Sequence, residues 1–259
     1  MTCRNDFLPH QRPSLLYLHE LSGLVPGEKL KQRLRLLFLQ SRPVLPRELM
    51  VNRGDSIVQV GIPSKNSLYR LIKSIGKSGS LLIVEPDERN QEMIVEVIGS
   101  LDASHNVRLV KKAAWHSTEE LVFHKSKRLG DGRIADKKIL HDNDIREQNE
   151  SGGYTEIILN ADRLDNILLE NKVDQLDFIE IAINGAEFHA LRGMGELVKK
   201  TKRLYIKGHA RDAESDEPIL FQIIDYLEGY DFFVKRTIAT RAVDSRWGDR
   251  EGDVYAWKI

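Results

Sequence analysis

The sequence predicts an α/β fold with a doubly wound, mostly parallel sheet of seven strands and an antiparallel hairpin at one edge. Three observations lead to this prediction. From residue 54 onward, short apolar runs alternate with stretches of helical periodicity, as in parallel sheets connected by helices. The runs are apolar along their whole length, as expected of strands covered on both faces. The last two runs, around Phe232 and Val254, are joined by a polar loop without a helix, which indicates the hairpin.

The elements follow one another in a regular order. The first run, Ser56-Ile-Val-Gln-Val-Gly61, ends at a glycine, and the second, Leu81-Leu-Ile-Val-Glu85, ends at an acid. The expected strands are residues 56–61, 81–85, 107–111, 176–183, 203–208, 230–236 and 253–258. The helices expected between them are residues 65–76, 88–99, 161–171, 186–200 and 216–228.

We expect residues 1–53 to be a separate N-terminal extension before the domain of residues 54–259, since five of the eight prolines punctuate it, and we expect it to be helical at its centre. Residues 28–40 have the pattern of an amphipathic helix with a basic face. We expect its apolar side to pack on the domain or on a second subunit rather than on lipid. A homodimer formed through this N-terminal region is therefore one hypothesis for the assembly.

Residues 125–153 are rich in charge and interrupted by glycines, so we expect a loop insertion outside the core. Its length exceeds that of ordinary connections, which leaves two interpretations, a lid or a plain disordered insertion. We favour the plain insertion. His141 and Asp144 within it resemble metal ligands, but no supporting partner is visible elsewhere, and we predict no metal site.

The charge balance and composition indicate which binding partners and structural features this protein is expected to lack. With 39 basic and 39 acidic residues, the formal net charge is zero, which argues against broad electrostatic attraction to nucleic acids or membranes. The first residues contain no apolar signal core, and no apolar run approaches about 18 residues, so we expect a cytoplasmic protein without stable membrane insertion. The single cysteine, Cys3, excludes an internal disulfide and a cysteine-rich zinc site.

Gly61 and Glu85 are the first candidates for a binding site. Sheets of this Rossmann-like type bind ligands at the carboxyl ends of their strands, where the strand order reverses. An acid at the end of the second strand can accept two hydrogen bonds from a ribose diol. Each residue also has a purely structural interpretation, as a turn glycine and as an acid near a helix N-terminus beside Pro86.

The turn after the first strand decides between cofactors. Pyrophosphate binding needs the repeated glycines of G-x-G-x-x-G, whereas residues 61–66 contain one glycine, and Pro63 lacks a backbone donor. NAD, FAD and nucleoside triphosphates are therefore disfavoured, and with them an oxidoreductase. S-adenosylmethionine has no phosphate and tolerates a loop with fewer glycines.

Four sequence blocks occur in the order and spacing of one known family. They are residues 54–61, 84–90, 107–114 and the longer block Val173-Asp-Gln-Leu-Asp-Phe-Ile-Glu-Ile-Ala-Ile-Asn-Gly-Ala-Glu-Phe-His-Ala-Leu-Arg-Gly193. In this order they resemble the FkbM-type S-adenosylmethionine-dependent methyltransferases over about residues 54–236. The resemblance implies methyl transfer to a hydroxyl group of a sugar, glycolipid or secondary metabolite, so that the partner is a small-molecule or glycan acceptor.

The resemblance also implies roles for individual residues. The cofactor-binding residues it points to are Gln59, Gly61, Ile62, Glu85, Pro86, Asp87, Ala113, Ala114, Ala182 and Asn184. His209, at the end of a strand, is the candidate base that takes the hydroxyl proton, and Glu187 is a second candidate catalytic residue. Structural interpretations remain open for both: a histidine hydrogen-bonded at a strand end, and a glutamate that stabilises a helix N-terminus.

Several positions depart from the family pattern. Gln59 and Ala182 stand where acids are usual, Lys65 stands where the second glycine is usual, and Asn184 replaces a glutamate. The loss of two acids facing a cationic cofactor is expected to lower affinity by roughly one to several powers of ten. The alternative function is therefore a catalytically inactive binding or scaffolding protein with the methyltransferase fold.

Overall fold

The computed structural model describes residues 51–62, 64–101, 103, 106–126, 133–134, 154–208, 219–238 and 252–258. The predicted N-terminal helix at residues 28–40 lies outside the described residues, as does most of the predicted insertion at 125–153. His209 lies outside them as well.

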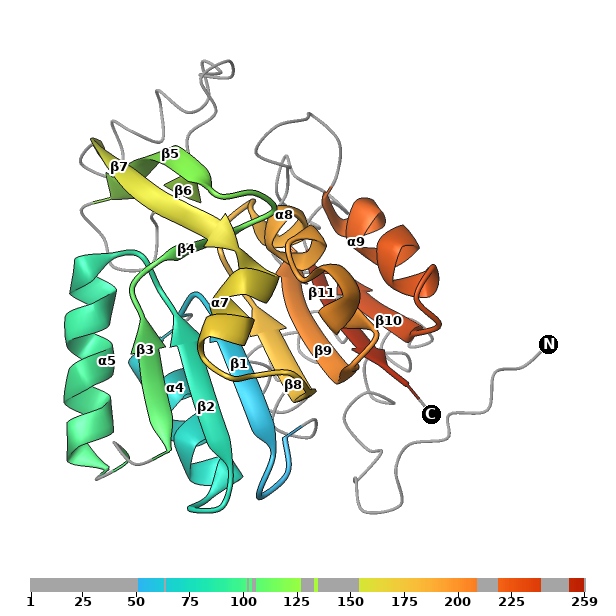
Figure 1. Ribbon diagram of the computed structural model, residues 1–259, viewed down its shortest axis with the longest axis horizontal. Coiled ribbons are helices and arrows are strands. Elements are labelled where there is room, and N and C mark those ends of the chain that lie inside the picture. Colours follow the sequence, from blue (N-terminus) through green and yellow to red (C-terminus); the bar gives the residue numbers. More distant parts are fainter. Residues whose placement is uncertain are drawn as a thin grey trace, which may run out of the picture. The chain divides into compact units, whose positions relative to one another are not determined.

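A seven-stranded sheet forms the centre of the described region, in the order β10-β11-β9-β8-β1-β2-β3 (Figure 1). Its strands are β1 (Ser56–Val60), β2 (Ser80–Val84), β3 (Val107–Val110), β8 (Leu176–Ile181), β9 (Thr201–Gly208), β10 (Phe233–Ile238) and β11 (Gly252–Trp257). The pairs from β9 across to β3 are parallel, whereas β11 runs antiparallel to both β9 and β10. The predicted sheet and its edge hairpin are thus confirmed.

Helices cover the two faces of this sheet. In Figure 1, α4 lies behind the strands, and α7 and α8 lie in front of them. The helices are α4 (Lys65–Ile75), α5 (Glu88–Ser100), α7 (Leu164–Glu170), α8 (Glu187–Arg192), the 3₁₀ helix η1 (Gly195–Val198) and α9 (Ile219–Glu228). Alternate residues of the strands, such as Val58 and Ile179, pack with α7, α8 and α9 in one continuous apolar core.

The first helix illustrates why these residues fold as they do. Ser64 precedes α4 in extended conformation, and its hydroxyl accepts a hydrogen bond from the amide of Ser67 at 3.1 Å. The buried residues of α4 are spaced three and four apart, so that one helix face meets the sheet. They are Leu68, Leu71, Ile72 and Ile75.

A second sheet of four strands corrects the sequence-based prediction. It has the order β4-β7-β5-β6, with β4 (Ala113–Trp115), β5 (Glu119–Ser126), β6 (Arg133–Ile134) and β7 (Tyr154–Arg163). The sequence predicted no strand between residues 111 and 176, and it began a helix at residue 161. The helix begins instead at Leu164, because residues 161–163 finish β7, where Ala161 pairs with Ala113 of β4.

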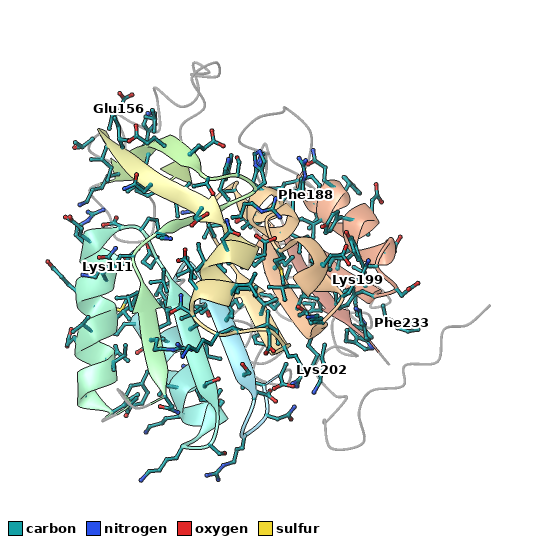
Figure 2. The ribbon with its side chains drawn as sticks, in the orientation of Figure 1. Lys111, Glu156, Phe188, Lys199, Lys202 and Phe233 are labelled. Carbon is teal, nitrogen blue, oxygen red and sulfur yellow. The ribbon has the colours of Figure 1, made fainter. Side chains whose placement is uncertain are left out.

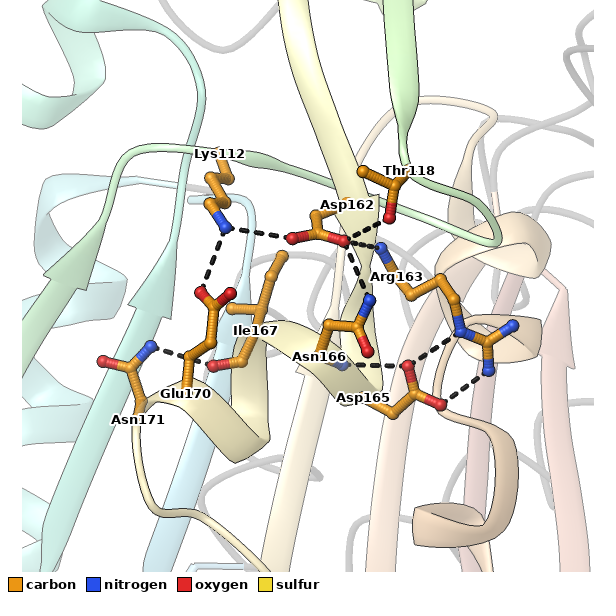
Figure 3. Close-up of polar contacts among 9 residues, drawn as sticks. All are labelled: Lys112, Thr118, Asp162, Arg163, Asp165, Asn166, Ile167, Glu170 and Asn171. Carbon is orange, nitrogen blue, oxygen red and sulfur yellow. Dashed lines mark hydrogen bonds and ion pairs between the residues drawn. The ribbon is translucent and has the colours of Figure 1, made fainter.

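Polar contacts between β7, α7 and the connections that flank β4 hold the second sheet to the first (Figure 3). The Asp162 carboxylate accepts hydrogen bonds from Lys112 Nζ at 2.9 Å and from Thr118 Oγ1 at 2.6 Å. Lys112 Nζ also contacts Glu170 of α7 at 3.0 Å. The second sheet is therefore fixed above the carboxyl ends of β2 and β3.

The helix predicted over residues 186–200 is divided into α8 and η1. Gly193 follows the last residue of α8, and its backbone lies against the carbonyl group of Trp115, where a Cβ would be 1.9 Å from that oxygen. The backbone of Gly195 has a positive φ of 51°, which a continuous right-handed helix does not accommodate.

Candidate active site

A crevice lies at the carboxyl ends of β1, β2 and β8, and it contains about 590 Å³ of space, including solvent at its mouth. The chain passes from β1 to β2 on one side and later returns to β8 on the other, so the crevice lies where the strand order reverses. Most of the residues that the sequence predicted for cofactor binding line it. These are Gly61, Ile62, Glu85, Pro86, Asp87, Ala113, Ala114, Ala182 and Asn184.

Gly61 allows the loops after β1 and β8 to approach each other closely. Its φ is +74°, and a Cβ at this position would lie 2.3 Å from the carbonyl oxygen of Ala182. The Gly61 amide donates a hydrogen bond to the carbonyl of Val84 at 2.9 Å, which continues the pairing with β2. A side chain at residue 61 would push these loops apart and alter the crevice.

Gln59 does not line the crevice. Its side chain is buried, and its Nε2 donates a hydrogen bond to the carbonyl oxygen of Gly61 at 2.8 Å. In this arrangement Gln59 fixes the conformation of the turn after β1. Direct contact between Gln59 and a cofactor stays a prediction.

Glu85 is a buried carboxyl group that lines the crevice, with 4% of its surface exposed. Its Oε1 accepts a hydrogen bond from the Asp87 amide at 2.9 Å, and its carboxylate also accepts from the Ile62 amide and the Asn90 side chain. Burial nevertheless raises the pKa of Glu85 to about 7. A carboxyl group of this kind changes its charge close to neutral pH.

Asp87 caps the N-terminus of helix α5. Its carboxylate accepts a hydrogen bond from the Arg89 amide at 3.0 Å and one from Arg89 Nη2 at 2.8 Å, and Lys125 Nζ lies 3.7 Å away. Burial alone would raise the pKa of Asp87, but the contacts with Arg89 and Lys125 outweigh it and hold the pKa below its ordinary value. Asp87 is thus the capping residue of α5, and the carboxyl group of Glu85 lies beside it in the lining of the crevice.

The loop after β8 turns sharply at Asn184 and Gly185, whose φ angles are +51° and +97°. Asparagine is the residue type, after glycine, that adopts this conformation most readily. Glu187 is fully buried, and its carboxylate accepts hydrogen bonds from the amides of Ile183 at 3.1 Å and Gly185 at 2.9 Å. These contacts favour a role for Glu187 in shaping the loop, and its catalytic role stays a prediction.

The histidines that the structure describes near this edge lie beside the crevice rather than in its lining. His189 of α8 stacks on Trp115 with ring centroids 3.9 Å apart, and its Nδ1 lies 3.0 Å from His116 Nδ1. This stack joins α8 to β4. The candidate base His209 follows Gly208, the last residue of β9, and is itself outside the described residues.

Sequence reasoning missed several residues of the crevice. Asn90 reaches it from α5, and Phe123 and Leu159 reach it from β5 and β7 of the second sheet. A signal was present, since Leu121, Phe123, Ile157 and Leu159 recur at every second position, as in strands with one buried face. Figure 2 shows Glu156 projecting from the other end of this sheet, and its side chain is 71% exposed.

The model of the methyltransferase FkbM domain matches residues 52–234, most of the chain. The chain belongs to the FkbM methyltransferase family. The general activity of this FkbM protein is therefore S-adenosylmethionine-dependent methyl transfer, as the four sequence blocks predicted. Among its described residues, no helix is long and apolar enough to cross a membrane.

Solved methyltransferase structures resemble the FkbM protein in fold. Fibrillarin from Aeropyrum pernix with natively bound S-adenosyl-L-methionine is 11% identical over 84% of this chain and 71% of its own, with a TM-score of 0.45. An O-methyltransferase from Bacillus cereus in complex with S-adenosylhomocysteine (SAH) is 13% identical over 98% of this chain and 94% of its own, with a TM-score of 0.43. Likenesses at this level concern the fold alone. A search of curated proteins found no match.

Proposed function

We propose that the crevice binds S-adenosylmethionine through its adenosine half, and that the enzyme methylates a hydroxyl group of a small-molecule or glycan acceptor. The observation that carries the proposal is the buried Glu85 carboxyl group at the reversal point of the sheet, beside Gly61. A carboxylate in this position accepts hydrogen bonds from both hydroxyls of a ribose.

The lining of the crevice fits the adenosyl group. Glu85 would hold the ribose, and the small apolar side chains of Ala113 and Ala114, each 4% exposed, would leave room for the base. Ala182 and Asn184 line the region after β8, where they would contact the methionine half without contributing a negative charge. This charge pattern supports weak binding in which the adenosine half provides most of the affinity.

The cofactor supplies a methyl group on a sulfonium, which transfers in line to a nucleophile. Such a transfer depends mainly on alignment and on exclusion of water, which the narrow turns at Gly61 and Asn184 support by fixing the loops of the crevice. We propose His209 as the group that accepts the hydroxyl proton, because in the sequence it directly follows Gly208, the last residue of β9. A sugar, glycolipid or secondary metabolite as acceptor rests on the family resemblance.

Thermal unfolding with S-adenosylhomocysteine tests the proposal. A ligand that binds only the folded state, at a concentration ten times its dissociation constant, raises the free energy of unfolding by about 1.4 kcal/mol. This corresponds to a rise of roughly 3–6 °C in melting temperature. We expect this rise for the native protein at millimolar ligand, and we expect Glu85→Ala to abolish it.

The matched control is Glu88→Ala, which removes an exposed carboxylate three residues further along the chain. This variant should retain the whole ligand-induced rise. A native protein that shows no rise would support the binding or scaffolding alternative. A rise that persists in Glu85→Ala would mean that the ribose lies elsewhere.

A further inference from the structure

The second sheet contributes to the crevice through the crevice-facing side of β5 and β7. Leu121 pairs with Leu159, and Phe123 pairs with Ile157, so these side chains lie on the same face of the sheet. Phe123 is 7% exposed, and it lines the crevice together with Leu159. An aromatic ring and a leucine thus form an apolar wall on an otherwise partly polar site.

Lys125 places this wall close to Glu85. It follows Phe123 by two residues on β5, so both side chains emerge from the same face of the strand. Lys125 Nζ lies 3.7 Å from the carboxylate of Asp87, which is two residues after Glu85. The crevice-facing side of the second sheet is therefore directed at the end of β2, where the acid that would hold a ribose is located.

The two sheets offer complementary chemistry to one ligand. The end of β2 provides a carboxyl group for a sugar diol, and the second sheet provides the ring of Phe123 beside the small side chains of Ala113 and Ala114. A flat heteroaromatic base stacks favourably on an aromatic side chain, and a base is joined directly to the ribose in a nucleoside.

We propose that the second sheet is the nucleobase-binding wall of the crevice, and that Phe123 contacts the face of the adenine ring. The adenosine half of the cofactor then spans both sheets, with its ribose on the first and its base on the second. This inference rests on the proposed function, and it adds a binding role for strands β5 and β7.

The test measures the dissociation constant of S-adenosylhomocysteine by titration calorimetry for the native protein, Phe123→Ala and Phe123→Leu. Loss of base stacking should weaken binding by about 5- to 100-fold in Phe123→Ala. Phe123→Leu keeps an apolar side chain and protects the fold, so it should weaken binding to an intermediate degree.

Leu121→Ala is the matched control, because Leu121 lies on the same strand and the same face but does not line the crevice. Its dissociation constant should stay within about threefold of the native value, since it removes packing without removing a ligand contact. Equal weakening in Leu121→Ala and Phe123→Ala would overturn the inference, because both would then act through the stability of the sheet.

The two proposals fail in different ways. If the native protein binds S-adenosylhomocysteine and Phe123→Ala binds it equally well, the nucleobase wall is wrong and the proposed function stands. If the native protein does not bind the ligand at all, both proposals are wrong.

Discussion

At the residue scale, Glu85 couples folding to pH, because burial raises its pKa from 4.5 to about 7. Between these values the folded state binds more protons than the unfolded state, so the contribution of Glu85 to the free energy of unfolding decreases as the pH rises. Over the whole interval the decrease is about 3 kcal/mol. We therefore expect the free energy of unfolding of Glu85→Gln, relative to that of the native protein, to increase by up to this amount as the pH rises from 5 to 8. Urea unfolding without ligand measures this difference.

Glu88→Gln is the control for this titration, since Glu88 is exposed at the start of the same helix. Its free energy of unfolding should follow that of the native protein across the pH range. A constant difference between Glu85→Gln and the native protein from pH 5 to pH 8 would contradict the raised pKa of Glu85.

The residues of the candidate site were predictable to the extent that their position along a strand determines their surroundings. Gly61 and Glu85 end adjacent parallel strands, and such strand ends meet at one edge of a sheet. The direction of a side chain after the strand is not determined in this way. Gln59 and Glu187 hydrogen-bond to backbone groups of the turns that follow β1 and β8, two to four residues away in the chain, and the residue types alone do not specify the conformation of these turns.

At the element scale, Gly193 controls the contact between α8 and β4. A Cβ at residue 193 would lie 1.9 Å from the Trp115 carbonyl oxygen and 3.0 Å from the Leu164 amide nitrogen, and neither backbone group can move without displacing its strand or helix. We expect Gly193→Ala to lower the free energy of unfolding by about 3 kcal/mol or more. Urea unfolding measures this loss.

Gly99→Ala is the matched control, because Gly99 lies in α5 and a Cβ there would have no neighbour within 4 Å. Alanine loses less backbone entropy than glycine when a helix forms, so the free energy of unfolding of this variant should rise by up to about 1 kcal/mol. Similar losses in both variants would show that the contact with Trp115 does not determine the cost.

Strands β5 and β7 escaped prediction because polar and charged residues flank their apolar residues on both sides. A strand buried on both faces is an unbroken apolar run, whereas the apolar part of β5 is only Leu121-Val122-Phe123, with Glu119 and Glu120 before it and His124 and Lys125 after it. Their partners are also distant in sequence, since the register joins Phe123 to Ile157 across the residues of the predicted insertion. Tertiary pairing of this kind overrides the local helical pattern at residue 161.

At the scale of the whole described region, Asp162 links the two sheets to each other. Its carboxylate accepts hydrogen bonds from Lys112, which follows β3, from Thr118, which precedes β5, and from Asn166 of α7 (Figure 3). Burial opposes ionisation, but these hydrogen bonds outweigh it and hold the pKa of Asp162 well below its ordinary value. The carboxylate therefore remains ionised and stabilises the folded state at neutral pH.

Asp162→Asn tests whether this carboxylate carries the attachment of the second sheet. It keeps the shape of the side chain but loses the charge-assisted acceptor, so we expect a loss of about 2 kcal/mol in the free energy of unfolding at pH 7. Because the pKa of Asp162 is lowered on folding, its contribution is complete above the unfolded value of 3.8 and decreases progressively as the pH falls from 3.8 towards the lower pKa of the folded state. The difference between Asp162→Asn and the native protein should therefore shrink in urea unfolding at pH 3.

Glu170→Gln isolates the effect of burial, because Glu170 accepts from the same lysine nitrogen at 3.0 Å while 59% of its side chain is exposed. An ion pair of this exposure contributes less than about 1 kcal/mol. Equal losses in Glu170→Gln and Asp162→Asn would assign the stabilisation to the charge of Lys112 alone. A larger loss in Asp162→Asn that shrinks as the pH falls below 3.8 would assign it to the buried carboxylate that joins β7 to both ends of the β4 segment.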